Sequence, residues 1–183
     1  MDELPLATGS APKSSQPPLP DSNVSRAARQ GSVHRVVIFR LEGQRYALHL
    51  PTVERVVHMV AVSPLPQAPA IVLGVVNFHG QIIPVLDIQR RLGFASRSHG
   101  LGSTLLIART TRRTLALPVD EALGVQEIAT DSVKSPATVF PGVGLLAGIA
   151  ALSDGVLFIH DPDAFLTPDE EQRLTEALEG SVI

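Results

Sequence analysis

The sequence predicts a mainly β protein made of two related halves, with a helix near its C-terminal end. Its composition is 44% hydrophobic and only 4% aromatic, so Val, Leu, Ile and Ala must form the core, and the β-branched residues favour sheets. Apolar runs of strand length are separated by turns that contain Gly and Pro. A length of 183 residues fits one domain, or two small subdomains that share a core.

The first segments are an arm and a hairpin. Residues 1–32 hold five prolines among Ser, Ala and Gln, with too little apolar surface to offset the entropy of ordering, so we expect a disordered arm. The run VHRVVIFRLEGQRYALHL, residues 33–50, has two β-rich parts around Glu42-Gly43-Gln44. This pattern predicts a hairpin.

A short helix, an extended loop and a second strand pair are expected next. Pro51 suits a first helical turn and predicts a short helical segment over PTVERVVHM, residues 51–59. The three prolines of VSPLPQAP, residues 62–69, predict an extended loop. Two strands should then flank the turn at residues 77–80, and a polar link follows over residues 95–103.

An internal repeat supports the plan of two halves. A shift of 69 residues places LLIARTTRRTLALPV over VVIFRLEGQRYALHL, and both segments predict a hairpin. A shift of 74 places GIAALSDGVLFIHDPDAFL over GVVNFHGQIIPVLDIQRRL, with Asp161 over Asp87. Because the two shifts occur in the same chain order, the sequence predicts a duplicated, pseudo-symmetric β unit.

The end of the chain predicts a helix over residues 167–180. Thr167 is a favourable N-cap and Pro168 fits the first helical position. Glu170 completes a capping box, and Gly180 suits the far end.

Asp87 and Asp161 are the candidates for acid–base chemistry. Paired carboxylates on related halves can share a proton, as in aspartic proteases, so a β-barrel enzyme or ligand-binding protein that uses this pair is the alternative function. Each Asp, however, precedes a potential first helical turn, and an N-cap role explains both. Geometry separates the two hypotheses, because a cap faces its own main-chain N–H groups and a catalytic pair faces a cleft.

Composition and spacing argue against several other functions. A formal net charge of −3 gives no general attraction to nucleic acid, and the absence of Cys excludes Cys-ligated metals and thiol catalysis. The histidines show no metal-ligand spacing and no dinucleotide motif is present, so we expect no cofactor and no metal. The N-terminus lacks a signal-peptide pattern, and apolar runs stop short of the roughly 20 residues of a membrane span. We expect a soluble, cytoplasmic protein without direct membrane insertion.

The order of motifs resembles the CheW-like adaptor family. The motifs are F-x-L-x-x-x-x-Y-A-L from Phe39, V-x-x-V from Val53, G-V-V-N-x-x-G-x-I-I-P-V-L-D from Gly74, P-V-D from Pro118 and V-x-x-I from Val125. They follow one another within residues 33–166, which we interpret as a CheW-like domain. The segment from Gly74 to Asp87 is the most specific part of the resemblance.

The resemblance implies two five-stranded SH3-like barrels around a shared apolar core. It also implies a non-enzymatic scaffold that couples chemoreceptor tips to the regulatory domain of a CheA-type histidine kinase, at receptor arrays on the inner membrane. A receptor helix would lie in an apolar groove between the barrels, which maps onto Val53, Gly74, Asn77, Leu105 and Val125. We favour this adaptor over an adaptor–receiver fusion or the kinase itself, since we find neither a receiver nor an ATP-binding domain in the sequence.

Two positions depart from the family pattern. The family has V-x-E-I in the first half and N-x-R-G in the turn, and its Glu and Arg pair with each other. Arg55 stands at the Glu position and His79 at the Arg position. Glu54 is one residue early, about 100° away on a helix, and cannot substitute. We include Arg55 and His79 in the candidate receptor-binding site and hypothesise that their joint replacement changed the receptor or kinase partner.

Overall fold

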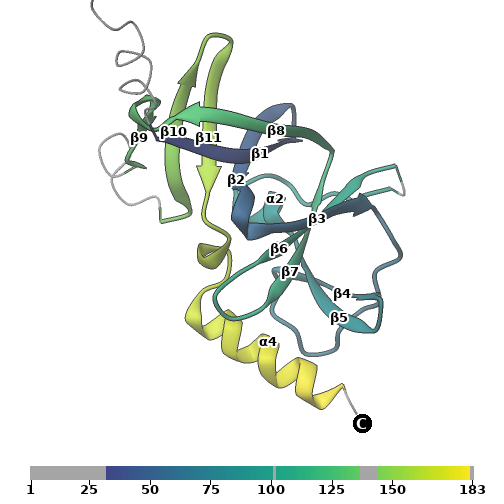
Figure 1. Ribbon diagram of the computed structural model, residues 1–183. Helices are drawn as coiled ribbons and strands as arrows, with labels where there is room; N and C mark the ends of the chain where they lie inside the picture. The colour runs from purple at the N-terminus through teal and green to yellow at the C-terminus, as the bar shows by residue number, and fades with distance from the viewer. Residues whose placement is uncertain (1–31, 101, 137–143, 182–183) are drawn as a thin grey trace, which may run out of the picture. The chain divides into compact units, whose positions relative to one another are not determined.

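The computed structural model describes residues 32–100, 102–136 and 144–181, which form two β-sheets (Figure 1). The expected arm, residues 1–32, lies outside this part of the chain except for Ser32. One sheet has the spatial order β8 (Glu121–Ala129), β1 (Val33–Leu41), β2 (Gln44–His49), β11 (Gly155–His160), β10 (Leu146–Leu152) and β9 (Val133–Lys134). The other has the order β3 (Val53–His58), β6 (Thr104–Arg109), β7 (Thr114–Val119), β5 (Gln81–Leu86) and β4 (Val72–Phe78). The mainly β class is confirmed.

The helical elements are short except for the one near the C-terminus. Helix α2 (Ile88–Arg91) follows β5, and three 3-10 turns cover Leu50–Thr52, Thr130–Ser132 and Pro162–Ala164. Helix α4 (Pro168–Gly180) begins with the expected capping box, in which the Thr167 hydroxyl accepts from the Glu170 N–H and the Glu170 carboxylate accepts from the Thr167 N–H. The predicted C-terminal helix is confirmed.

Each half of the chain supplies a hairpin to the sheet of the other half. The hairpin β1–β2 lies in the sheet with β8 to β11, whereas β6–β7 lies in the sheet with β3 to β5. Antiparallel pairing joins β1 to β8 and β6 to β3. The other strand of each hairpin makes a parallel pairing, between Ile159 and Ala47 in one sheet and between Val85 and Ala116 in the other. The two pairings join equivalent positions of the repeat, so the exchange is symmetric.

The repeat extends to strand ends and β-bulges. Strands β10 and β11 begin and end 74 residues after β4 and β5. The β4–β5 register shifts between Val72 and Gly74, and the β10–β11 register shifts at the equivalent Leu146 and Gly148. The predicted duplication is therefore present in the backbone as well as in the apolar pattern.

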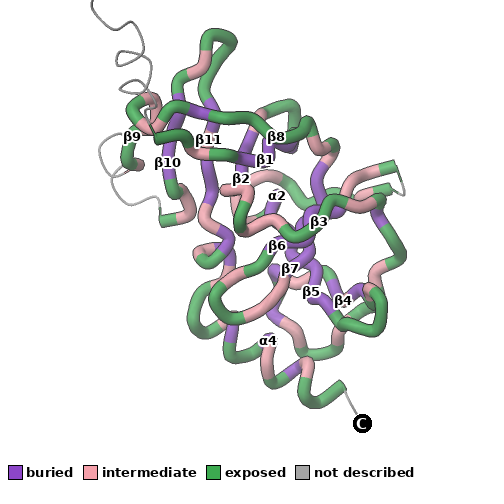
Figure 2. The backbone as a smooth tube through the Cα atoms, viewed as in Figure 1, coloured by how far each residue is buried: buried purple, intermediate pink, exposed green. Residues whose placement is uncertain are grey.

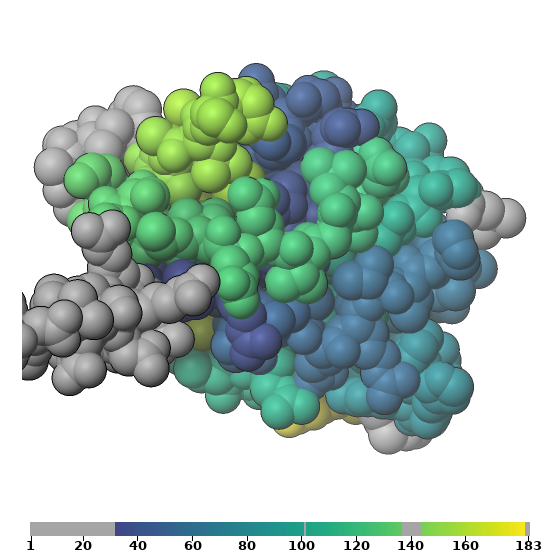
Figure 3. All heavy atoms as spheres, turned by 45° about the horizontal axis from the view of Figure 1, so that its top comes forward, coloured from purple at the N-terminus to yellow at the C-terminus, as the bar shows by residue number. Residues whose placement is uncertain are grey.

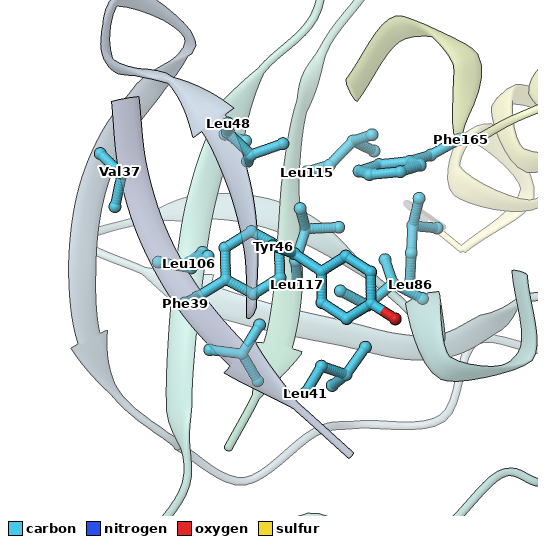
Figure 4. Packing of buried hydrophobic residues seen from close by; sticks show 13 residues of the cluster. Val37, Phe39, Leu41, Tyr46, Leu48, Leu86, Leu106, Leu115, Leu117 and Phe165 are labelled. Atoms are coloured by element: carbon cyan, nitrogen blue, oxygen red, sulfur yellow. The ribbon is translucent and has the colours of Figure 1, made fainter. Parts of the chain in front are cut away.

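Three apolar clusters form the interior of the described residues (Figure 2). One cluster belongs to the six-stranded sheet and includes Val36, Ile38, Ala47, Ile128, Ala150, Leu157 and Ile159. A second belongs to the five-stranded sheet and includes Met59, Val76, Ile83, Val85, Leu105, Ile107 and Ala116. The third, the shared core, takes residues from both sheets, among them those labelled in Figure 4: Val37, Phe39, Leu41, Tyr46, Leu48, Leu86, Leu106, Leu115, Leu117 and Phe165.

The exchanged hairpins are buried on both faces. In β1, Ile38 faces the cluster of its own sheet while Val37 faces the shared core. In β6, Leu105 faces the cluster of the five-stranded sheet and Leu106 faces the shared core. A strand buried on both faces needs continuous apolar sequence instead of alternation. Burial on both faces explains the apolar runs VVIF in β1 and LLIA in β6. In the sheet order, β8 lies at the edge next to β1, and β3 lies at the edge next to β6.

Two details differ from the sequence predictions. The helical segment predicted from Pro51 is wrong, because only Leu50–Thr52 form a 3-10 turn and the chain continues as strand β3. The second difference is a sixth strand in one sheet, the two-residue β9, which pairs with Ile149 and Ala150 of β10. Its counterpart in the other half is an isolated bridge between Ser63 and Val75.

Candidate functional site

Two edge strands carry apolar side chains beside the shared core. Val56 on β3 pairs with Leu106, and Val125 on β8 pairs with Val37, and both partners are shared-core residues. Cross-strand partners project from the same face of a sheet, so Val56 and Val125 face the shared-core side. They are nevertheless 46% and 57% exposed. Figure 3 shows side chains of β3, in blue, and of β8, in green, on one face of the molecule.

A β-bulge in each edge strand sets this orientation. The β3–β6 register shifts between Val53 and Arg55, and the β8–β1 register shifts opposite Ile38 and Phe39. A bulge adds one residue, so residues three apart can face the same side of a strand. Val53 and Ala122 consequently pack against the shared core. We call Val53, Val56, Ala122 and Val125 the edge strip.

The extra residue of the β3 bulge is held by an ion pair. Glu54 accepts a hydrogen bond of 2.6 Å from the Arg109 Nε, and a second guanidinium nitrogen of Arg109 contacts the same carboxylate oxygen. Arg109 is the last residue of β6, so the pair fastens the bulge to the neighbouring strand. Glu54 is thereby engaged within its own sheet.

Arg55 and His79 meet at the ring of Phe78. The guanidinium carbon of Arg55 lies 5.3 Å from the Phe78 ring centroid, a cation–π distance. The rings of Phe78 and His79 have centroids 4.5 Å apart and are nearly perpendicular. Because β3 and β4 are the two edges of the five-stranded sheet, the Arg55–Phe78 contact shows that this sheet curls until its edges meet.

Asn77 has a local role in the same turn. Its side-chain oxygen accepts a hydrogen bond of 2.9 Å from the Gly80 N–H. His79 lies between them with a φ of 51°, a left-handed conformation. Asn77 therefore shapes the turn that presents His79, and the structure groups Arg55, Asn77 and His79 around Phe78.

Two predicted groove residues lie in the interior instead. Leu105 is fully buried in the cluster of the five-stranded sheet. Gly74 is buried with a φ of 147°, and a Cβ atom there would lie 2.2 Å from the Ser63 carbonyl oxygen. Ser63 and Val75 exchange two main-chain hydrogen bonds of 2.8 Å beside it. Gly74 thus lets the proline loop pack on β4.

Asp87 and Asp161 have the contacts of helix caps. Asp87 accepts from the Arg90 N–H at 3.0 Å, and its other oxygen accepts from the Ser96 hydroxyl. Asp161 accepts from the Asp163 N–H at 3.0 Å. Both carboxylates face main-chain groups of the turn that follows them, as the N-cap interpretation predicts.

Two kinds of feature are absent from the described ranges, 32–100, 102–136 and 144–181. No group of three or more His, Cys, Asp or Glu side chains in them is arranged to hold a metal ion. No helix in them is long and apolar enough to cross a membrane.

The family assignment is decided by a match to a family model. Residues 35–170 match the model of the CheW-like domain, which is more than half of the chain. The chain belongs to the CheW-like family. The structural comparison agrees: the scaffolding protein TtCheW from Thermoanaerobacter tengcongensis superposes with a TM-score of 0.69 and 26% identity, over 76% of this chain and 96% of TtCheW. The predicted fold of two SH3-like subdomains is thereby confirmed.

Individual CheW proteins are distant relatives in sequence. The chemotaxis protein CheW of Rhizobium meliloti (strain 1021) is 21% identical over 139 residues, which cover 75% of this chain and 90% of that protein. The CheW of Treponema pallidum (strain Nichols) is 25% identical over 146 residues, which cover 76% and 86%. These similarities extend over most of both chains.

Sequence reasoning on this CheW-like chain missed two residues. Val56 was not predicted as a surface residue, although the 69-residue shift that relates the halves places it under Val125 and would have identified it. Phe78 was treated only as a turn residue. A single aromatic between Asn77 and His79 gave no local signal of its contact with Arg55, because that contact depends on closure of the sheet.

Proposed function

We propose that this protein is a non-enzymatic adaptor of a bacterial chemosensory system, which couples the cytoplasmic tip of a chemoreceptor to the regulatory domain of a CheA-type histidine kinase. The match to the CheW-like domain over residues 35–170 is the observation that carries the proposal. The edge strip supports it, because exposed apolar residues above a rigid core suit the apolar face of an amphipathic helix.

The edge strip supplies the receptor contact in this proposal. Val53 and Ala122 already pack on the shared core, so their positions are fixed before a partner binds. Val56 and Val125 stand on β-strands and lose little side-chain entropy on burial, since β-branched residues are already restricted. A receptor helix that covers both valines removes exposed apolar surface at low cost in ordering.

A binding experiment tests the receptor contact. We expect the purified chain to bind a receptor coiled-coil tip in isothermal titration calorimetry, and Val125→Glu to weaken this affinity at least about tenfold, because a carboxylate would be buried without a partner. Val156→Glu is the matched control, since Val156 is a similarly exposed valine, 48%, on β11 outside the edge strip. Equal loss of affinity in both variants, or no binding by the wild type, would count against the proposal.

We further propose that Arg55 and His79 select the partner. Arg55 forms no ion pair with a carboxylate of the described residues and stacks on Phe78 instead. The surface therefore presents a guanidinium group at the place where the resemblance to the CheW-like pattern implies an acid–base pair, which favours a partner with a carboxylate at this point.

The selectivity proposal is tested with a panel of receptor tips and kinase regulatory domains. Arg55→Glu combined with His79→Arg restores the family pair, and each single substitution completes a double-mutant cycle. We expect the double variant to change the order of affinities across the panel. An unchanged order would reject a role for these two residues in partner choice.

A further inference from the structure

Two histidine rings meet at one end of the six-stranded sheet. The ring centroids of His34 on β1 and His49 on β2 are 5.3 Å apart, and the ring planes are inclined by 53°. His49 pairs with Val36, and His34 lies two residues before Val36 on the same strand. Both rings therefore project from the same face of the sheet. The hairpin creates this contact, so the linear spacing of the histidines does not predict it.

The ring nitrogens of this pair are open to a ligand. Both residues are half-buried. The ring-nitrogen hydrogen bond found among the histidines of the described residues belongs to His160. The buried side-chain nitrogen and oxygen atoms without a partner in this part of the chain belong to Arg91 and His160. The ring nitrogens of His34 and His49 are thus unpartnered within the described residues and accessible to solvent.

The surroundings of the pair favour a cation. His34 pairs on its other side with Ile128, a buried residue that offers no competing polar side chain. Asp161 directly follows strand β11, and the β11–β2 register places it beside His49. Burial and, secondarily, His34 lower the pKa of His49 below 6.5, although the Asp161 carboxylate acts in the opposite direction. His49 is therefore neutral at pH 7, which is the form of imidazole that binds a metal ion.

The distance between the rings fits one metal ion held by both. With metal–nitrogen bonds of about 2.0–2.1 Å and a tetrahedral angle, the centroids of two imidazole ligands lie about 5 Å apart. The torsion that orients a histidine ring has broad minima, so a half-buried ring can turn a nitrogen toward an ion. Imidazole suits Zn²⁺, Ni²⁺ and Cu²⁺, whereas Mg²⁺ and Ca²⁺ prefer oxygen ligands.

We propose that His34 and His49 together bind one exchangeable divalent transition-metal ion, such as Zn²⁺. No third His, Cys, Asp or Glu side chain of the described residues completes a metal-binding group, so water fills the remaining coordination positions. The last pair of the β1–β2 ladder is Val36 with His49, and His34 lies beyond it. A shared ion consequently fastens the first residues of β1 to the end of β2.

Titration of the full chain with zinc, without a histidine tag, tests the proposal. We follow the ring resonances of all six histidines by NMR while ZnCl₂ is added, and we measure affinity and stoichiometry by isothermal titration calorimetry. We expect one ion per chain, saturable shifts at His34 and His49 before any other histidine, and no such shifts with MgCl₂. The wild-type resonances locate the site without any substitution, so this result does not depend on the stability of a variant.

Single substitutions test whether both rings are ligands. His34→Gln and His49→Gln should each weaken zinc binding at least about tenfold. His58→Gln is the matched control, since His58 is an exposed histidine of β3 outside the pair, and it should leave the affinity unchanged. Loss of affinity in only one of the two variants, equal shifts at all histidines, or no saturable binding up to about 1 mM Zn²⁺, as expected for two rings that only touch, would each overturn the proposal.

Discussion

A main-chain carbonyl oxygen lies beside two interior residues, Gly74 and His160, and constrains each of them in a different way. At Gly74 the Ser63 oxygen occupies the space that a Cβ atom would need. At His160 the Leu145 oxygen fixes the proton on Nδ1, and burial of the ring lowers the pKa of His160 to about 4. The sequence alone identified Gly74 as a family position but assigned it to a groove, because the packing of the proline loop is not visible in local pattern.

Gly74→Ala should destabilise the protein by at least about 2 kcal/mol. The substitution adds a methyl group against the Ser63 carbonyl and places Ala at a φ of 147°. Chemical denaturation measures the effect. Gly102→Ala is the control, since a Cβ atom there meets nothing within 4 Å, and it should change stability by less than about 0.5 kcal/mol. Equal effects of the two substitutions would contradict the packing role of Gly74.

The stability of the protein should fall below about pH 6.5 because of His160. The pKa of His160 is lowered to about 4 in the folded state from 6.5, so between these values the unfolded chain takes up a proton that the folded protein does not. The contribution of neutral His160 to the free energy of unfolding is therefore fully present above pH 6.5. It decreases toward pH 4, by on the order of 3 kcal/mol in total. Denaturation of wild type and His160→Leu across this range measures the difference, and parallel pH profiles would contradict it.

At the scale of elements, strand β3 shows why a local pattern can mislead. Val53 and Val56 are three residues apart, which is a helical spacing, and Pro51 fits a helix start. In the structure the bulge at Glu54 turns both valines to the same side of a strand. A bulge in β8 likewise places Ala122 and Val125, which are also three residues apart, on the same side of that strand. In both strands the spacing of three residues therefore results from a bulge and not from a helix.

The element with the strongest local signal, helix α4, was predicted correctly. Its capping box uses Thr167 and Glu170, which are adjacent on the first turn and need no tertiary contact. Thr167→Ala should lower the free energy of unfolding by about 1 kcal/mol through loss of the cap. Thermal and urea denaturation test this, with the exposed Glu179→Ala as a control that should have almost no effect. A loss no larger than that of the control would show that the cap does not matter.

At the scale of the whole molecule, the exchange of hairpins makes the halves interdependent. The repeat indicated two units and the resemblance implied a shared core, but no local pattern states which hairpin joins which sheet. That pairing depends on contacts distant in sequence, such as Ile159 with Ala47. For the same reason Leu105 could not be placed in the interior by its motif alone, since its burial depends on the sheet that β6 enters.

Cutting the chain in the link between the halves tests this interdependence. Fragments 1–100 and 101–183 should each lack cooperative unfolding, since each leaves its exchanged hairpin without the sheet that it completes. Mixing the fragments should restore a dispersed amide spectrum and a cooperative transition. Cooperative folding of fragment 1–100 by itself would contradict an obligatory exchange.

Co-sedimentation tests the coupling of two partners most directly. The regulatory domain of a CheA-type kinase is mixed with vesicles that carry receptor cytoplasmic tips, with and without this chain, and the pelleted kinase domain is measured. We predict that the kinase domain pellets with the vesicles in a manner that depends on the wild-type chain and is lost with Val56→Glu combined with Val125→Glu. Pelleting that is the same with and without the chain, or unchanged by the double substitution, would contradict an adaptor that acts through the edge strip.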